Sequence, residues 1–231
     1  MTPESIKKSF FRPAGLEKYD MAIRKKQARK SRDKELRREA ILDAAEDIFY
    51  KKGYEKTSMD HVAEQSGYAK GTLYLYYKNK EALYLALALR VKRRSEETIC
   101  ERAHEGENGY EKLRLLREAF FAYFRDRPRQ YRTLQHSNQM TSRLLKKSSE
   151  LREDRIFQTA LEFFREGRED GSISREIEPV PYLLAASAME WGLLSFWHDR
   201  GEMLRKETGL DAAELVAYAH DLTDLKRIAG D

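Results

Sequence analysis

A short segment near residue 70 combines side chains that suit DNA contacts with a glycine that would let the backbone approach a groove. It reads Lys-Gly-Thr-Leu-Tyr-Leu-Tyr-Tyr from Lys70 to Tyr77. Lysine can donate to guanine acceptors, and the hydroxyls of threonine and tyrosine suit phosphate oxygens. Leu73 and Tyr77, four residues apart, can pack this helix on a neighbour. The alternative, a packed aromatic core, explains Tyr77 and at most one other tyrosine.

The preceding residues supply the helix that must position this segment. Thr57 is expected to open it, with Asp60 three residues later in capping-box spacing, and Gly67 is expected to end it at a turn. Ala63 is small where two helices would cross closely. Residues 57–77 therefore have the organisation of a helix-turn-helix. The outer surface of its second helix would consist of Lys70, Gly71, Thr72, Tyr74 and Tyr76.

Charge is unevenly divided along the 231 residues. Residues 1–95 hold 23 Lys and Arg against 13 Asp and Glu, whereas residues 96–231 hold 21 against 26. The basic part suggests a polyanionic partner that the acidic part does not share. The densest basic run, from Arg24 to Arg38, has two interpretations. It is either a solvated, frayed tail or an arm that contacts phosphates or enters a minor groove beside the DNA-binding helix.

Periodicity and composition predict an all-α protein of about nine helices. Apolar residues recur at helical spacing from Leu36 onward, and no alternating apolar and polar stretch indicates a strand. Residues 1–21 lack periodicity. In the second half we expect helices at 110–126, 129–140, 149–169, 180–198 and 211–228, separated by prolines, serines and glycines such as Gly201.

Several protein classes are disfavoured. The five histidines lie far apart without metal-ligand spacing, and no P-loop or nucleophile elbow is present, so we expect no enzyme, no metal and no cofactor. The lone Cys100 excludes an intramolecular disulfide and is expected to be a buried side chain rather than a redox sensor. The first residues do not form a signal peptide, and Pro181 and Glu190 interrupt the most apolar stretch. We therefore expect a cytoplasmic protein without a membrane span.

Residues from about 36 to 84, above all Gly67 to Leu83, resemble the DNA-binding domain of TetR/AcrR-type transcriptional regulators. The shared pattern is a glycine, then Lys-Gly-Thr-Leu-Tyr, an aromatic pair, Lys-x-Lys-Glu and a leucine. The resemblance covers about a fifth of the chain. It implies a three-helix helix-turn-helix DNA-binding domain over residues 36–82, and a larger helical domain over 83–231 that binds a small molecule and forms the dimer. Residues 1–35 would be a basic N-terminal extension.

The same resemblance implies roles for individual residues. Lys70 and Thr72 would contact bases or phosphates, the outer tyrosines would contact the DNA backbone, and Lys80 would clamp a phosphate. Thr57 or Ser58 would anchor the first motif helix. The implied DNA-contacting residues are Thr57, Ser58, Lys70, Gly71, Thr72, Tyr74, Tyr76 and Lys80. Ala69 stands where a Ser or Thr cap is common, which removes about 1 kcal/mol of capping.

Aromatic residues and a methionine of the middle helices are candidates for lining a ligand pocket. Several recur at helical spacing and share buried faces, so core packing is the competing explanation for each of them. A pocket of this composition would suit a hydrophobic small molecule. The candidates are Phe120, Phe124, Tyr131, Met140, Phe157, Phe164 and Trp191.

The apolar-rich segments 180–198 and 211–228 are expected to pair with their symmetry mates as a four-helix homodimer interface, with an intramolecular core as the alternative. The first segment would contribute Tyr182, Ala186, Met189, Leu193 and Trp197. The second would contribute Leu215, Ala219, Leu222 and Leu225. A two-fold dimer would read a palindrome in double-stranded DNA with half-sites about 34 Å apart.

These observations predict a homodimeric transcriptional regulator, a repressor that an unidentified hydrophobic small molecule releases from a palindromic operator. A DNA-bound adaptor of the same fold, without a small-molecule switch, would carry an identical motif. An enclosed cavity among the middle helices distinguishes the two. A helical module that binds only proteins would show no DNA binding.

Overall fold

The computed structural model describes residues 14–139 and 154–226, and α-helices are the only regular elements in these two stretches. The all-α prediction is therefore confirmed. The helices are α1 (Ala14–Lys56), α2 (Met59–Ser66), α3 (Lys70–Tyr76), α4 (Lys80–Ala103), α5 (Gly109–Arg125), α6 (Pro128–Gln139), α9 (Arg155–Asp170), α10 (Pro179–Thr208) and α11 (Ala212–Leu222). Met140, one of the pocket candidates, lies outside the described residues.

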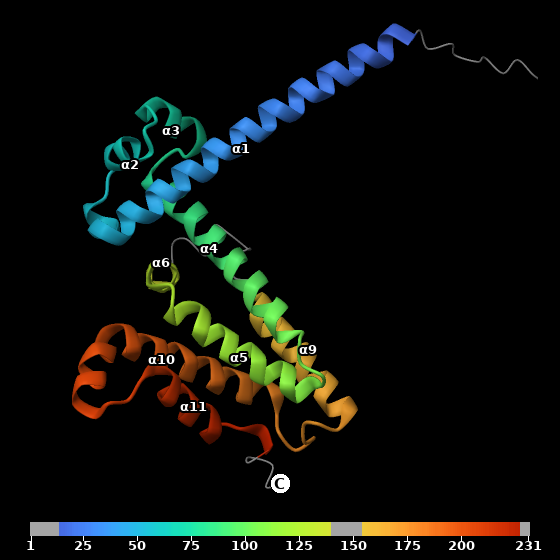
Figure 1. The fold of residues 1–231 in the computed structure, drawn as a ribbon, viewed down its shortest axis with the longest axis vertical. Coiled ribbons are helices and arrows are strands. Elements are labelled where there is room, and N and C mark those ends of the chain that lie inside the picture. Colours follow the sequence, from blue (N-terminus) through green and yellow to red (C-terminus); the bar gives the residue numbers. More distant parts are fainter. Residues whose placement is uncertain (1–13, 140–153, 227–231) are drawn as a thin grey trace, which may run out of the picture.

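The second half of α1 packs with α2 and α3 into a small head at one end of the molecule (Figure 1). Ile41 of α1, Val62 of α2 and Leu73 of α3 are each 0% exposed and form its centre. Gly67 ends α2 in the left-handed region, with φ of 70°, where a side chain would be strained. Leu73 and Tyr77 face the core as predicted, and this orients the remaining faces of α3.

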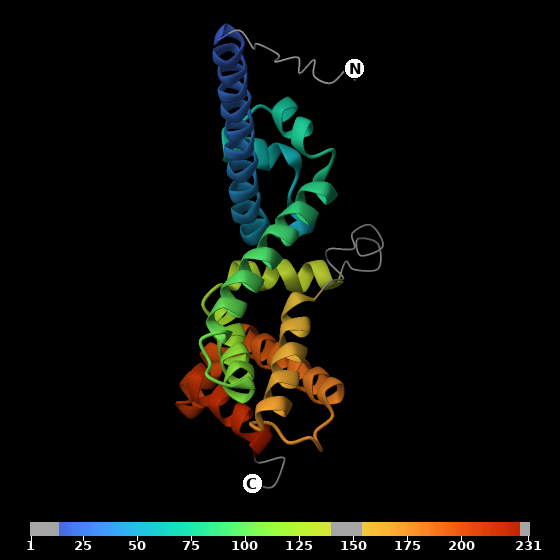
Figure 2. The ribbon, with the colours of Figure 1, turned by 90° about the vertical axis from the view of Figure 1, so that its right-hand side faces the viewer.

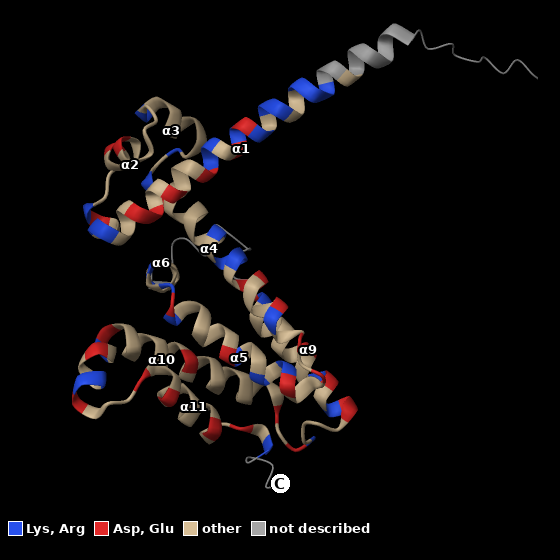
Figure 3. Cartoon of the chain, viewed as in Figure 1, with Lys and Arg blue, Asp and Glu red and all other residues tan. Residues whose placement is uncertain are grey.

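The first half of α1 extends beyond the head, away from the rest of the protein (Figures 1 and 2). α1 begins at Ala14 rather than near residue 36. The expectation that residues 1–21 form no periodic structure was therefore wrong for residues 14–21. Every residue from Arg24 to Arg38 is exposed. Figure 3 shows that Lys and Arg dominate this stretch. Helix formers such as Lys, Arg, Gln and Ala continue the turn without any apolar face to bury.

α4 joins the head to a larger helical body made of α5, α6, α9, α10 and α11 (Figure 1). The domain border expected between residues 82 and 83 therefore falls inside an unbroken helix. In the body, α5 and α9 approach closely at Gly109. A Cβ added there would lie 2.1 Å from the backbone nitrogen of Gly167, so only glycine permits this backbone-to-backbone contact.

α10 is longer than predicted, because it continues through Gly201 to Thr208. Gly201 does not end the helix. A Cβ there would lie 2.8 Å from the ring of Trp197, so the glycine makes room for this ring. The helix ends at Gly209, whose φ of 75° is left-handed. No helix within the described residues is long and apolar enough to cross a membrane.

Candidate functional site

α3 presents a polar and aromatic surface to solvent at the head. Lys70, Gly71 and Tyr74 are exposed, whereas Thr72 and Tyr76 are half-buried. Tyr76 packs against the core with part of its ring, which limits the contact predicted for it. Leu75, which was not among the predicted DNA contacts, is 83% exposed. An apolar side chain this exposed beside a lysine is available to contact a thymine methyl group or a sugar.

The N-terminus of α3 carries one strong local interaction. The ammonium of Lys70 lies 2.7 Å from a carboxylate oxygen of Asp60 on α2, and this hydrogen bond raises the pKa of Lys70. Ala69 precedes the helix without a capping side-chain bond. The first backbone N–H groups of α3 are therefore left for solvent or another partner.

The capping of α2 differs from the prediction. Thr57 is 3% exposed, and its hydroxyl donates to the carbonyl of Gly53 at 2.7 Å. The hydroxyl of Thr57 is therefore engaged at the end of α1 in this conformation and does not face the solvent, which limits the DNA contact predicted for it. Ser58 caps α2 instead, accepting from the backbone N–H of His61, while Nδ1 of His61 accepts from the N–H of Ser58. Ser58 remains exposed.

Lys80 links α4 to the end of α1. Its ammonium donates to the carbonyls of Tyr54 at 2.8 Å and Glu55 at 3.3 Å, and lies 4.3 Å from the centre of the Tyr54 ring. Cations stabilise the exposed carbonyls at a helix C-terminus. In this conformation Lys80 is engaged within the protein, so contact with a phosphate requires these bonds to be exchanged.

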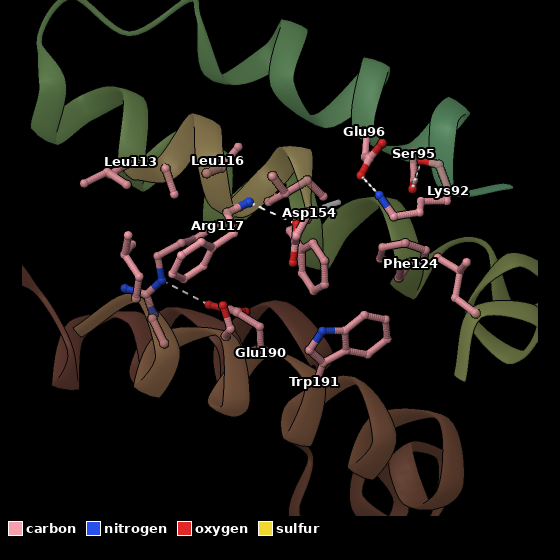
Figure 4. A pocket seen from close by; sticks show the side chains of 18 of the residues that line it. Lys92, Ser95, Glu96, Leu113, Leu116, Arg117, Phe124, Asp154, Glu190 and Trp191 are labelled. Carbon is pink, nitrogen blue, oxygen red and sulfur yellow. Dashed lines mark hydrogen bonds and ion pairs between the residues drawn. The ribbon is translucent and has the colours of Figure 1, made fainter. Parts of the chain in front are cut away.

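A cavity of about 260 Å³ lies inside the body, lined by α4, α5, α6, α9 and α10. Four predicted residues lie in its wall: Phe120, Phe124, Phe157 and Trp191 (Figure 4 shows Phe124 and Trp191). Tyr131 and Phe164 do not. Tyr131 stacks on His198 with ring centres 4.3 Å apart, and Phe164 packs against Tyr182, so both belong to the core behind the cavity.

The cavity wall also holds ionic groups that were not predicted. Arg117 of α5 donates through Nε to Oε1 of Glu190 on α10 at 3.1 Å (Figure 4). Lys92 and Glu96 form a second ion pair within α4. A signal for Glu190 was present in the sequence, because this residue interrupts an otherwise apolar helix. Nothing in the sequence pattern singled out Arg117.

Comparison with known proteins identifies the head. The family described as "Bacterial regulatory proteins, tetR family" matches residues 41–87, which include all of α2, the turn and α3. The head therefore belongs to the TetR family. A fatty acid metabolism regulator protein of Bacillus subtilis is 34% identical over 82 residues, which are 36% of this chain and 42% of that protein. The alignment thus spans less than half of that curated relative.

The fold similarity to solved structures extends over most of the chain. The fatty acid degradation regulator FadR of Bacillus halodurans has a TM-score of 0.65 at 23% identity, covering 81% of this chain and 94% of that one. FadR of Bacillus subtilis, solved with stearoyl-CoA, has a TM-score of 0.58 at 20% identity, covering 80% and 96%. At these identities the comparison shows a shared fold.

Two helices that line the cavity, α4 and α6, also contact α1. α6 lines the cavity with Leu134 and Ser137. The same helix contacts α1 through an ion pair between Arg129 and Asp47 and a hydrogen bond from Gln130 to Glu46. α4 contributes Lys92, Ser95 and Glu96 to the cavity. Arg90, close to Lys92 on the same helix, forms ion pairs with α1. Helices that line the cavity are therefore in direct contact with α1.

α4 and α1 are joined by an ion cluster around one buried guanidinium. Arg90, with a side chain only 7% exposed, donates to Asp43 at 2.6 Å, to Glu46 at 2.8 Å and to Glu39 at 3.2 Å. Three acidic residues on one face of α1 thus surround one guanidinium of α4. Arg94 adds an exposed contact to Glu39 at 2.8 Å.

The predicted dimer residues mostly face inward. Ala186, Ala219 and Leu225 are buried in the body, and the hydroxyl of Tyr182 donates to the carbonyl of Thr223. For these residues the intramolecular alternative was right. The apolar side chains that α10 and α11 leave exposed are different ones, apart from Leu222. They are Val180, Leu184, Phe196, Met203, Tyr218 and Leu222.

Cys100 is buried as expected, at 2% exposed. Its thiol donates to the hydroxyl of Thr159, and burial raises the pKa of this thiol. A protonated, inaccessible thiol is unsuited to redox sensing.

Proposed function

We propose that this chain is a DNA-binding transcriptional regulator that acts as a homodimer. The surface of α3 is the observation that supports this most directly. It brings Lys70, Gly71 and Tyr74 together on the exposed side of a short helix, with an uncapped N-terminus beside them. Such a helix can lie in a major groove with its first residues on base edges and its hydroxyl groups on phosphates.

The exposed stripe of α10 supports the dimer. Leu184, Ala188, Gly192 and Phe196 follow one another at four-residue spacing, and all four are exposed. Small residues in the middle of such a stripe let two helices approach closely, and larger apolar residues at its ends add buried area. Tyr218 and Leu222 extend an apolar surface on α11. A two-fold contact of this kind would carry two copies of α3.

The cavity favours a ligand-controlled regulator over an adaptor without a switch. A small molecule among the middle helices would move α4 and α6, which hold α1 through Arg90 and Arg129. A difference of about 2–3 kcal/mol in ligand affinity between the two arrangements would change operator binding by tens to hundreds of fold. We propose release from a palindromic operator, hence repression, with a largely hydrophobic ligand.

The test is fluorescence anisotropy with a labelled duplex taken from the DNA that flanks the chain's own gene, beside an unrelated duplex, over a series of salt concentrations. Tight, salt-sensitive binding that prefers the flanking duplex is the expected result. Tyr74→Phe should weaken it at least about tenfold. Tyr50→Phe, which removes the same hydroxyl from a ring that faces Arg129 of α6, should not. Absence of binding to either duplex at low salt contradicts the proposal.

A further inference from the structure

Glu190 is the most buried carboxylate of the cavity wall, with a side chain only 5% exposed. Its two oxygens differ sharply. Oε1 accepts from Arg117 and lies 2.8 Å from Nε2 of His220. Oε2 is buried and has no hydrogen-bond partner among the described residues. A carboxylate oxygen left without a donor in a low-dielectric interior is costly, so this side chain favours a partner that supplies one.

The hydrogen bonds of Arg117 within the described residues all go to atoms other than this oxygen. Its Nε binds Glu190, one terminal nitrogen donates to the hydroxyl of Tyr182 at 3.3 Å, and the other donates to the hydroxyl of Thr223 at 2.7 Å. All three nitrogens are therefore engaged between α5, α10 and the end of α11. The guanidinium is a fixed structural connector rather than a free anion receptor.

The formal charges of the cavity wall also favour a partner that supplies a donor. The described wall contains three carboxylates, of Glu96, Asp154 and Glu190, against two cations, of Lys92 and Arg117. Both cations are already paired with carboxylates in the wall. Among the described residues of the wall, carboxylates therefore exceed cations by one, which favours a bound cation over a bound anion.

Apart from three serines, the rest of the described wall is apolar. Phe120, Phe124, Phe157 and Trp191 surround the space next to Glu190, together with leucines of α5, α6 and α10. Such a surface binds a hydrocarbon or aromatic body, and a single buried polar group fixes its orientation.

We propose that the cavity binds an amphipathic cation, an apolar body with a protonated amine, whose ammonium donates to the carboxylate of Glu190 when a small rotation of this side chain brings Oε2 to the cavity surface. The inference rests on the proposed ligand-controlled function and specifies its ligand class. It differs from the stearoyl-CoA that one structural relative binds, because an acyl thioester with its phosphates offers no cation. A cationic group would complete the hydrogen bonding of Glu190 and balance the excess negative charge.

The test compares three ligands with the same chain and different heads: decylamine, decanol and decanoate. Isothermal titration calorimetry on the full chain at neutral pH measures each dissociation constant below the micelle-forming concentration. We expect decylamine to bind at least tenfold more tightly than decanoate, with decanol between them. Glu190→Gln, which keeps the shape of the side chain and removes its charge, should erase most of this preference. Glu202→Gln, on an exposed turn of the same helix, should leave it unchanged.

The comparison within the unaltered protein does not depend on how the variant folds. Decanoate binding as tightly as decylamine, or more tightly, would overturn the inference. Failure of all three ligands to bind would overturn it as well. Neither result touches the DNA titration, whose outcome is measured without any ligand, so failure of the ligand class and failure of the regulator function are distinguishable.

Discussion

The ammonium of Lys70 on α3 and the carboxylate of Asp60 on α2 lie 2.7 Å apart, so the cation at the start of the proposed recognition helix already has an anionic partner. Both side chains are more than half exposed. DNA phosphates or guanine acceptors must therefore compete with Asp60 for this lysine, and the carboxylate itself repels the DNA backbone.

Asp60→Asn should strengthen DNA binding, because it frees Lys70 and removes a negative charge from the contact surface. The gain should be about two- to fivefold, in the range expected for an exposed ion pair. Anisotropy at fixed salt measures it. Glu64→Gln, an exposed change on the same helix, should give a smaller effect. Unchanged affinity in Asp60→Asn would mean that Lys70 remains unused on the duplex.

Removing the exposed first half of α1 should weaken DNA binding and lower its dependence on salt. Nine Lys and Arg stand against two acidic residues from Arg24 to Arg38. For every phosphate that the shortened protein no longer neutralises, the slope of log K against log salt becomes shallower by about 0.9. Deleting residues 1–31 removes five of these nine cations and leaves Glu39 and the core of the head in place. Identical slopes with and without the segment would assign it no role on DNA.

Arg90→Met should destabilise the fold strongly, because three carboxylates of α1 would lose their buried partner. The expected loss is about 3–5 kcal/mol in the free energy of unfolding. Arg94→Met is the matched control, since its guanidinium is exposed and shares only Glu39, and should cost under about 1 kcal/mol. Urea denaturation followed by circular dichroism compares the two. Similar losses would show that burial of Arg90 adds nothing.

Gly192→Arg should separate the proposed dimer without unfolding the chain. A Cβ at this position meets nothing within 4 Å, so the body accommodates a side chain there. A charged side chain on the exposed stripe of α10 would have to be buried without a partner in the dimer. Light scattering after size exclusion should report half the mass, and Glu207→Arg, near the end of the same helix, should keep the full mass. An unchanged mass for Gly192→Arg would place the interface elsewhere.

Acid should destabilise the protein through His136. Burial lowers the pKa of this histidine below its usual value near 6.5, and its ring packs against Tyr54 and Tyr84. The unfolded chain then binds more protons than the folded one as pH falls through about 6.5, so stability decreases there. His136→Gln should reduce the drop in melting temperature between pH 7.5 and pH 5.5. An equal drop in both proteins would contradict this assignment.

The structure of the head was more predictable than that of the body, because interactions between residues close in the sequence determine it. Gly67, Leu73 and Tyr77 have their roles from turn chemistry and helical spacing alone. Thr57 and Ser58 are neighbouring hydroxyl residues, and only the position of the Gly53 carbonyl decides which one is buried and which caps α2.

In the body, the sequence showed the helical periodicity of each segment but not which side of each helix faces the core. α10 has apolar residues on more than one side, so its pattern did not indicate which stripe is buried. Gly201 and Trp197 illustrate the same limit, because a glycine that accommodates a ring has the same sequence signature as one that ends a helix. The hydrogen bonds of Arg117 join α5 to residues 65 to 106 positions away, which no local pattern contains.

α4 is a single rod with the cavity near its middle and the head at its first turn. Lys80 and Glu96 are 16 residues apart, or about 24 Å at 1.5 Å per residue. A rotation of about 5° around the cavity would move the first turn by about 2 Å, and two opposed copies would change their separation by about 4 Å. DNA fixes the distance between successive major grooves at about 34 Å. In the proposed dimer, a ligand that tilts α4 by only a few degrees would therefore be enough to make the distance between the two copies of α3 differ from the spacing of successive major grooves.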